Sequence, residues 1–243
     1  MKNILYSLYG WLLLVIIALI LLMILPCVFI LRLFFNSVFE KTLSLASRIF
    51  LFLFFPLTIN VSGVISPPEK GTKRMYVVSH GSRLDGVLLS LLPGRIFYLM
   101  KDKDAAIPVF GWIIKWAGHV LLPKNTSLHN SDGIIDTCRH VFEKGGSFLI
   151  FPEGTRSRDG QIGRFHTGAF ILAKMCGADL YPVIFDTYKV LPRGKIIFQD
   201  FKVNIHFLKP VLHSEMNNKT PKELSTEIKN EMIGVLKNKR SVN

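Results

Sequence analysis

Residues 75–92 read MYVVSHGSRLDGVLLSLL. The first five residues form a short apolar run rich in β-formers, which predicts a buried strand over 75–79. After polar and glycine positions, residues 84–92 predict a helix that Pro93-Gly94 closes. A strand followed directly by a helix is the repeating unit of a parallel sheet with crossover helices. This stretch therefore sets the expected fold class.

The same alternation continues along the chain. Further strands are expected at 96–100, 147–151, 180–185, 195–198 and 202–207, the last two as a candidate pair. A helix is expected at 131–144, with Gly145 just beyond its end. Another begins where Thr220 and Glu223 flank Pro221 as a capping box. We expect an α/β fold with a mostly parallel sheet and flanking helices.

The first sixty residues have a different character. Residues 4–31 carry no charge, and as helix at about 1.5 Å per residue they would exceed a bilayer core of about 30 Å. A second apolar block, 49–59, contains Pro56 and is too short to cross a bilayer, so it reads as an interfacial or re-entrant segment. We expect a membrane anchor at 1–60, with transmembrane or re-entrant helices, and a polar domain at 61–243.

The orientation of the anchor follows from its few charges. Lys2 stands alone before the first apolar block, and the basic residues after it are Arg32, Lys41 and Arg48. This bias predicts that the polar domain lies on the cytoplasmic side of the membrane. The anchor either only tethers the domain or also guides an insoluble substrate to it.

The composition excludes several classes of protein. Hydrophobic residues make up 49% and charged residues 19%, which fits neither a disordered chain nor an ordinary soluble globule. The net charge is +13, and most of the excess lies beyond residue 60. Basic residues are scattered singly with no nucleic-acid motif, so anionic lipid or a phosphorylated metabolite is the expected partner and nucleic acid is not. The three cysteines have neither disulfide-framework nor zinc-site spacing.

Two polar loops follow expected strands. His80 to Asp85 follows the strand at 75–79, and Pro152 to Ser157 follows the strand at 147–151. In an open α/β sheet, ligands bind beyond the carboxyl ends of the strands. We therefore expect these loops to face one site.

His80 and Asp85 are five residues apart, so they do not share one face of a helix, but they can pair across a turn. The carboxylate would then accept the Nδ1 proton of the imidazole and leave Nε2 as a general base. In the alternative interpretation, Asp85 only stabilises a helix N-terminus and His80 bonds to backbone. The sequence shows no recognisable serine or cysteine nucleophile, which favours direct deprotonation of a substrate hydroxyl.

The second loop has residues that suit phosphate. Gly154 permits a close backbone approach, Thr155 offers a hydroxyl, and Arg156 offers a planar fork of donors. Its alternative is a turn held by an ion pair between Glu153 and Arg156. For an oxyanion, backbone amides near Gly81 or in the Gly154 loop are the expected donors.

Together the loops resemble the glycerolipid acyltransferase family typified by 1-acylglycerol-3-phosphate acyltransferase. In that family an H-x-x-x-x-D block precedes an F-P-E-G-T-R-S block, and this chain has both, at 80–85 and 151–157. Two further blocks match its pattern: Lys101, Pro108, Gly111 and Gly118, and then Tyr181-Pro182-Val183. The four blocks occur in order across residues 76–185.

The resemblance implies transfer of a fatty acyl group from a thioester of coenzyme A or acyl carrier protein to a lysophospholipid hydroxyl. The leading acceptor is lysophosphatidic acid, which would give phosphatidic acid in phospholipid biosynthesis. His80 would be the base and Asp85 its orienting partner. Arg156 and Lys101 would hold the acceptor phosphate, and Glu153, Gly154 and Thr155 would shape that pocket. No metal and no cofactor besides the thioester co-substrate is expected.

The chain departs from the family pattern at Leu122-Pro123-Lys124, where an acidic residue and an arginine are usual, and at His166, where a basic residue is common. These departures leave the acceptor open: glycerol 3-phosphate, another lysophospholipid or lyso-ornithine lipid are alternatives. A thioesterase or lipase, with water as acceptor, and a lipid-binding scaffold without turnover are alternatives of other classes.

Overall fold

The computed structural model describes residues 2–34, 38–53, 57–63, 65–69, 71–101, 106, 111, 119–122 and 132–242. Its strands are β1 (Thr58–Ser62), β2 (Arg74–Val78), β3 (Arg95–Lys101), β4 (Val120–Leu122), β5 (Gly146–Ile150), β6 (Asp179–Asp186) and β7 (Lys202–Phe207). Its helices are α1 (Lys2–Phe34), α2 (Val38–Leu53), α3 (Asp85–Leu88), α5 (Asp132–Glu143), α6 (Gly168–Cys176) and α7 (Pro221–Val242), with 3₁₀ turns η1 (Leu89–Leu91) and η4 (His213–Met216).

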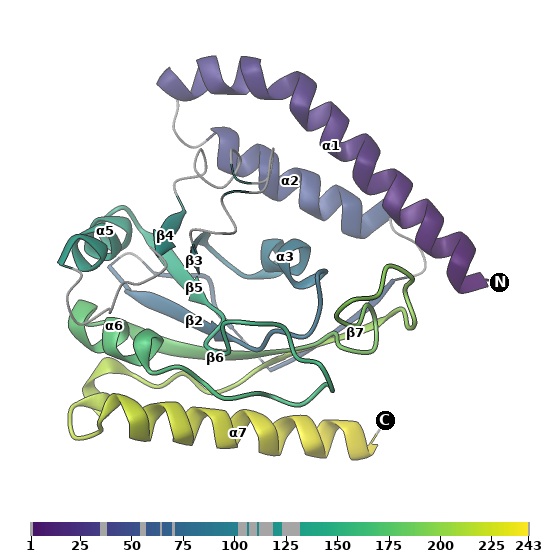
Figure 1. Ribbon diagram of the computed structural model, residues 1–243. Coiled ribbons are helices and arrows are strands. Elements are labelled where there is room, and N and C mark those ends of the chain that lie inside the picture. Colours follow the sequence, from purple (N-terminus) through teal and green to yellow (C-terminus); the bar gives the residue numbers. More distant parts are fainter. Residues whose placement is uncertain are drawn as a thin grey trace.

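The strands form one mixed sheet in the order β1-β7-β6-β2-β5-β3-β4 (Figure 1). Neighbours are parallel except β6 and β7, which run antiparallel. The expected α/β fold with a mostly parallel sheet is confirmed. Because β2, β5 and β6 lie side by side and parallel, their carboxyl ends meet at one edge of the sheet.

Helices cover both faces of this sheet, as the alternation along β2 shows. Met75 and Val77 join the core that includes α5, α6 and α7, whereas Tyr76 and Val78 join the core that includes α2 and α3. All four side chains are at most 1% exposed. A strand buried on both faces explains why this segment is a continuous apolar run and lacks polar alternation.

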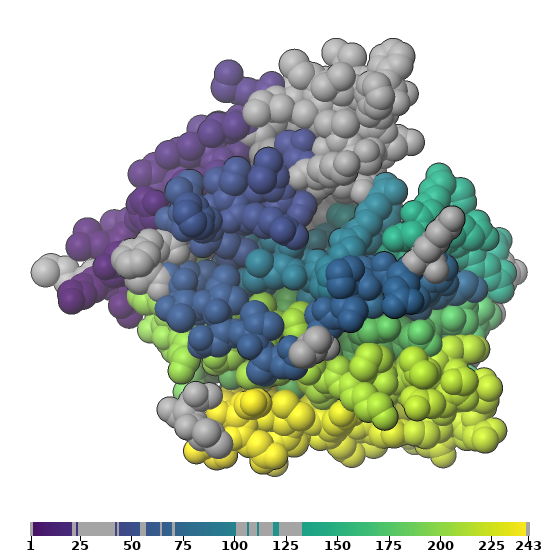
Figure 2. Space-filling model, turned by 180° about the vertical axis from the view of Figure 1, so that it is seen from behind, coloured from purple at the N-terminus to yellow at the C-terminus, as the bar shows by residue number. Residues whose placement is uncertain are grey.

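The N-terminal and C-terminal helices lie on opposite sides of the domain, α1 above α2 and α7 below the sheet (Figure 1). Seen from behind, the purple N-terminal helix and the yellow C-terminal helix are again at opposite margins (Figure 2). α1 packs on α2.

The segment that joins β6 to β7 differs from the sequence-based expectation. Residues 195–198 are no strand, although their residue types favour one. Gly194, with φ of +83°, closes a turn, and the backbone beyond it bonds to α1. The amide of Phe198 donates to the Ser7 hydroxyl at 2.8 Å, and the indole of Trp11 donates to the Ile196 carbonyl. The strand prediction is wrong because these backbone groups bond to a helix.

The second apolar block, expected at 49–59 as an interfacial segment, is divided between two elements. Phe50 and Leu51 on α2 are buried in the core beside α3, whereas Phe52 is 86% exposed. The block then ends in β1, an edge strand of the sheet that pairs with β7. The expected domain boundary at residue 60 falls within this strand.

Candidate active site

His80 and Asp85 meet where β2 turns into α3. His80 lies two residues beyond the end of β2, and Asp85 is the first residue of α3. The imidazole Nδ1 lies 2.6 Å from the Asp85 Oδ2. The His80 side chain is 22% exposed and the Asp85 side chain 0%. The structure therefore brings the two residues together across the turn, with the imidazole toward solvent and the carboxylate inside.

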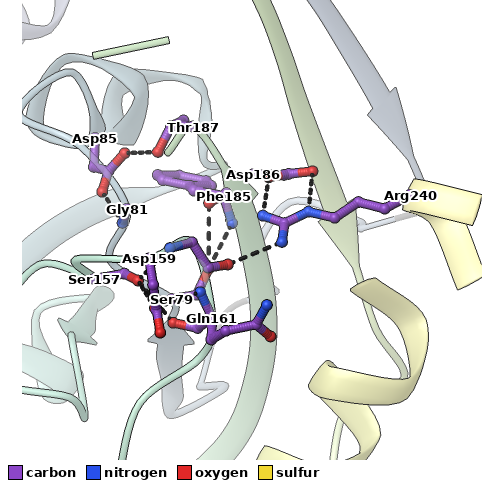
Figure 3. A network of polar contacts seen from close by, with 11 residues as sticks. Ser79, Gly81, Asp85, Ser157, Asp159, Gln161, Phe185, Asp186, Thr187 and Arg240 are labelled. Atoms are coloured by element: carbon purple, nitrogen blue, oxygen red, sulfur yellow. Dashed lines mark hydrogen bonds and ion pairs between the residues drawn. The ribbon is translucent and has the colours of Figure 1, made fainter. Parts of the chain in front are cut away.

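Asp85 accepts bonds from four donors. Its Oδ2 also accepts the amides of Gly81 at 2.9 Å and Ser82 at 3.0 Å. Its Oδ1 accepts the hydroxyl of Thr187 at 2.6 Å, which Figure 3 shows reaching Asp85. Backbone amides can only donate, so the oxygen that they contact is an acceptor. The proton between Asp85 and His80 therefore belongs to Nδ1, and Nε2 has the lone pair.

Gly81 permits the approach of Thr187 to this carboxylate. A Cβ at position 81 would lie 2.8 Å from the Thr187 hydroxyl oxygen and 3.0 Å from the amide nitrogen of Tyr188. Contacts below about 3.0 Å force the neighbouring atoms to move. The absence of a side chain at position 81 therefore leaves the space that Thr187 and the backbone of Tyr188 occupy beside Asp85.

The second loop holds the backbone of His80 on both sides. The amide of His80 donates to Glu153 Oε1 at 2.9 Å, and the His80 carbonyl accepts the amide of Ser157 at 2.8 Å. The ring of Phe151 stacks on the imidazole, with centroids 4.1 Å apart and planes 20° from parallel. The loop after β5 therefore fixes the position of the histidine that follows β2.

Glu153 lies inside this junction and faces the protein backbone. Its second oxygen, Oε2, accepts the amide of Gly163 at 2.8 Å, and the residue is 6% exposed. Burial raises the pKa of this carboxyl above its ordinary value, although the two backbone amides act in the opposite direction. The carboxylate thus links the backbone of His80 to the segment after the second loop.

Thr155 and Arg156 form a more open end of the site. Gly154 has a positive φ of 63°, which turns the loop outward before Thr155. The exposed guanidinium of Arg193 donates to the Thr155 hydroxyl at 3.0 Å and to the Arg156 carbonyl at 3.4 Å. Two arginines therefore come from separate segments to one exposed loop. This arrangement suits an anionic group.

A small depression, with about 20 Å³ of room for water-sized molecules, borders His80 on the side of α7. Ser79, Glu153, Tyr188 and Arg240 are among the residues that line it. His80 therefore borders a small open space on the α7 side of the domain.

Two amides expected to stabilise an oxyanion are engaged within the protein. The Gly81 amide donates to Asp85, and the Gly154 amide donates to the Phe151 carbonyl at 3.0 Å. These two amides bond within the protein, and the expectation of an oxyanion donor near Gly81 or in the Gly154 loop stays a prediction. The first loop's amides hold the Asp85 carboxylate in place.

Several expected positions lie outside the described part of the chain. Lys101 ends β3, but its side chain is outside the described part, as are Pro108, Gly118 and Lys124 in full. Gly111 is buried and described. The role of Lys101 stays a prediction.

Sequence reasoning missed Thr187, Arg193 and Arg240. Thr187 directly follows β6, so applying the strand-end rule to a third strand would have found it. Arg193 lies in the turn just before residues 195–198, for which the sequence wrongly predicts a strand. No local signal marks Arg240, which bonds to Asp186 from near the end of α7.

Comparisons with known proteins identify the family of the chain. A family model described as Acyltransferase matches residues 59–186. A chloroplastic 1-acyl-sn-glycerol-3-phosphate acyltransferase of Arabidopsis thaliana is 34% identical over 137 residues, covering 56% of this chain and 38% of that protein. The enzyme of the same name from Escherichia coli K12 is 30% identical over 114 residues, covering 46% of each chain.

The chain thus aligns with less than half the length of these curated relatives. A crystal structure of the 1-acyl-sn-glycerophosphate acyltransferase PlsC from Thermotoga maritima superposes with a TM-score of 0.73 at 24% identity. That likeness covers 98% of this chain and 96% of that one. It shows that the two chains share a fold over nearly their whole length.

Proposed function

The chain belongs to the Acyltransferase family, and on that premise we propose that it transfers a fatty acyl group from an acyl thioester to the hydroxyl of lysophosphatidic acid, forming phosphatidic acid. The names of the relatives support this acceptor. The observation that carries the proposal is the bonding of Asp85 Oδ2. This oxygen accepts from the amides of Gly81 and Ser82 and from His80 Nδ1, so the proton of the imidazole lies on Nδ1. An imidazole held in this tautomer is a general base at Nε2.

The reaction needs one base and one activated carbonyl. His80 Nε2 takes the proton of the acceptor hydroxyl as its oxygen attacks the thioester carbon. The tetrahedral intermediate then expels the thiolate, which takes the proton back from Nε2, leaving an ester and a thiol. Asp85 stabilises the imidazolium that forms between these steps. Because a thiolate leaves readily, no metal step is required.

The open end of the site supports a phosphorylated acceptor. Arg156 and Arg193 lie at one loop, and Arg193 donates to neutral groups, a hydroxyl and a carbonyl. A phosphomonoester has the charge and oxygen geometry to accept bonds from such forks. Lys101 is proposed as a third contact, as the family resemblance implies. Thr155 and Gly154 set the shape of the loop that the phosphate would meet.

The outer face of α1 supports membrane association. The window Lys2–Ile20 is long and apolar enough to cross a membrane, and only 11% of it is buried. Large apolar side chains are exposed along it, among them Leu5, Leu8, Leu12, Ile16 and Leu19. Exposed apolar residues on α2 and on the turn before β7 extend this surface: Leu45, Ile49, Phe52, Ile196 and Ile197.

We place α1 along the membrane surface with its outer face in the lipid. Near its start, Ser7 is 3% exposed and bonds to Phe198, and the Asn3 amide donates to the Gln199 carbonyl. Tyr9 bonds to the Leu53 carbonyl of α2 at 2.9 Å. A helix held to its domain at its first turns does not leave it to reach the opposite leaflet, which favours an interfacial anchor. The domain is proposed to face the cytoplasm.

The function is tested with purified protein in lipid nanodiscs and a labelled acyl donor. Lysophosphatidic acid, glycerol 3-phosphate, lysophosphatidylcholine and lyso-ornithine lipid are offered separately, each with acyl-coenzyme A and with acyl carrier protein. We expect labelled phosphatidic acid as the main product and none from His80→Ala. Release of labelled fatty acid without a diacyl product would show a hydrolase, and preference for another acceptor would reassign the substrate.

Membrane attachment is tested by flotation with anionic vesicles. Leu12→Asp, on the exposed face of α1, should reduce the bound fraction because it puts a charge into the proposed lipid contact. The matched control is Met175→Asp, since Met175 is 43% exposed on α6 at the other face of the sheet. Equal binding by both variants would contradict this placement of α1.

A further inference from the structure

Arg240, near the end of α7, joins two segments that lie far apart in the sequence. Its guanidinium forms a two-point ion pair with Asp186, from Nη2 to Oδ1 at 2.6 Å and from Nε to Oδ2 at 3.2 Å. The third nitrogen, Nη1, donates to the Gly160 carbonyl at 2.9 Å. Figure 3 shows the side chain reaching from the helix to Asp186. The Arg240 and Asp186 side chains are 28% and 11% exposed.

One of these segments leads to Asp85. Asp186 is the last residue of β6, and the next residue is Thr187, whose hydroxyl donates to Asp85 Oδ1 at 2.6 Å. Thr187 is fully buried. The orientation of this hydroxyl therefore depends on where β6 ends, and Arg240 holds that end.

The other segment leads to His80. The Gly160 amide donates to the Ser157 hydroxyl at 2.9 Å, and the Ser157 amide donates to the His80 carbonyl at 2.8 Å. Gly160 has a φ of +80°, and a Cβ there would lie 2.7 Å from the Tyr188 ring. The two segments thus pack directly on each other beside Arg240.

The chemistry of arginine suits this position. A planar guanidinium can bond to a carboxylate at two points and to a carbonyl at a third in one fixed geometry, whereas lysine is a point charge on a flexible stem. A partly exposed ion pair adds little to stability. The geometry that this side chain imposes is therefore its larger contribution.

We propose that Arg240 is a positioning residue for the reaction: it fixes the end of β6 and the Ser157–Gly160 turn relative to each other, and so orients the His80–Asp85 pair. The inference rests on the proposed function, because the rate of acyl transfer is the measurement that reveals the orientation of His80 and Asp85. Arg240 acts through Asp186, Thr187 and Ser157 and touches no reacting atom in this scheme. A misplacement of about 1 Å at a reacting group can cost roughly 10²-fold in rate.

The first test measures Arg240→Gln against wild type in nanodiscs with lysophosphatidic acid and acyl-coenzyme A. We expect kcat to fall by about 10- to 100-fold, with KM for lysophosphatidic acid changed less than about twofold because the loop of Thr155 and Arg156 is not altered. Arg240→Lys should recover part of kcat. The control is Lys237→Gln, which removes an exposed charge from the same helix. Thermal unfolding by circular dichroism shows whether each variant is folded at the assay temperature.

The second test asks whether Arg240 acts through Thr187, which it does not contact. Thr187→Val alone should lower kcat, and the double variant should be less impaired than the product of the two single effects. Purely multiplicative losses would overturn the inference, because two independent structural defects behave that way. If Arg240→Gln does not fold, Asp186→Asn takes its place in the same cycle and is judged by the same criterion.

The outcomes separate this inference from the proposed function. A wild-type protein that acylates no acceptor would refute the function. An active wild type with Arg240→Gln at full kcat would refute the positioning role alone. An equal loss in Lys237→Gln, or a loss confined to KM, would also refute it.

Discussion

The two ends of the candidate site differ in how much of their bonding is completed by the protein. At the dyad end, formed by His80, Asp85 and Thr187, the carboxylate is buried and accepts four donors from its own chain. At the head-group end, formed by Thr155, Arg156 and Arg193, the guanidinium of Arg193 is exposed. In the proposed reaction the dyad end is preorganised for proton transfer, whereas the acceptor phosphate adds contacts at the head-group end.

The strongest test of this contrast is removal of the base. His80→Ala should lower kcat by about 10²- to 10⁴-fold, the usual contribution of a general base. KM for lysophosphatidic acid should change little, since the head-group end is intact. His140→Ala is the control, because His140 is 62% exposed on α5. A kcat within tenfold of wild type would contradict the role of His80.

Removal of only the charge at the dyad end should have the next largest effect. Asp85→Asn can still accept the Nδ1 proton and the two amides if its nitrogen faces Thr187. It lacks the negative charge that stabilises the imidazolium, and we expect a loss of about 10²-fold in kcat. Thermal unfolding checks the fold. A variant that binds acceptor more weakly but turns over normally would show that the two ends are not separate.

At the head-group end the effect should appear in KM. Arg156→Ala and Arg193→Ala should each raise KM for lysophosphatidic acid by about three- to tenfold, with kcat changed less, because a ground-state phosphate contact is lost. The increase should shrink at high salt, since salt screens exposed charges. Arg139→Ala, at an exposed position on α5, is the control. An unchanged KM for lysophosphatidic acid in both variants would contradict binding of the acceptor phosphate at this end.

The smallest expected effect concerns Glu153, the buried carboxylate behind His80. Burial raises its pKa in the folded protein, so the folded state holds this proton more tightly than the unfolded state. Its contribution to stability is present below the ordinary pKa and is lost as pH rises through the raised one. The free energy of unfolding of wild type should therefore decline relative to that of Glu153→Gln as pH rises from 4.5, the ordinary glutamate pKa.

Chemical denaturation of both proteins across this pH range measures the difference. Glu153→Gln should also lower kcat by a few-fold, because an amide nitrogen would face one of the two backbone donors. Glu143→Gln, at an exposed position, is the control. A stability difference that does not vary with pH would refute the assigned burial effect.

The sequence was most informative where local pattern and position in the sheet agreed. The apolar run before His80 predicts a buried strand, and the five-residue spacing to Asp85 permits pairing across a turn, which is one of the two interpretations that the sequence leaves open. The second loop could be brought to the first because strands β2 and β5 were expected to be parallel and their carboxyl ends to meet.

The contacts that were missed depend on tertiary packing. Thr187 lies 102 positions beyond Asp85, and Arg240 reaches its partners only because α7 packs back along the sheet. Residues 195–198 have the composition of a strand, but their backbone bonds to α1. The sequence did not indicate β1 because its apolar residues directly follow a membrane-like block. Strand propensity alone does not predict whether a segment joins the sheet, because this depends on which backbone groups lie next to it in the folded chain.

The segment between β6 and β7 contacts Asn3, Ser7 and Trp11 on one side and Thr155, through Arg193, on the other. A shortened enzyme lacking α1, prepared to avoid detergent, would therefore lose the support of the turn that carries Arg193. A water-soluble version for laboratory synthesis of lipids would be better obtained by substituting polar residues along the outward face of the helix and keeping its inner contacts.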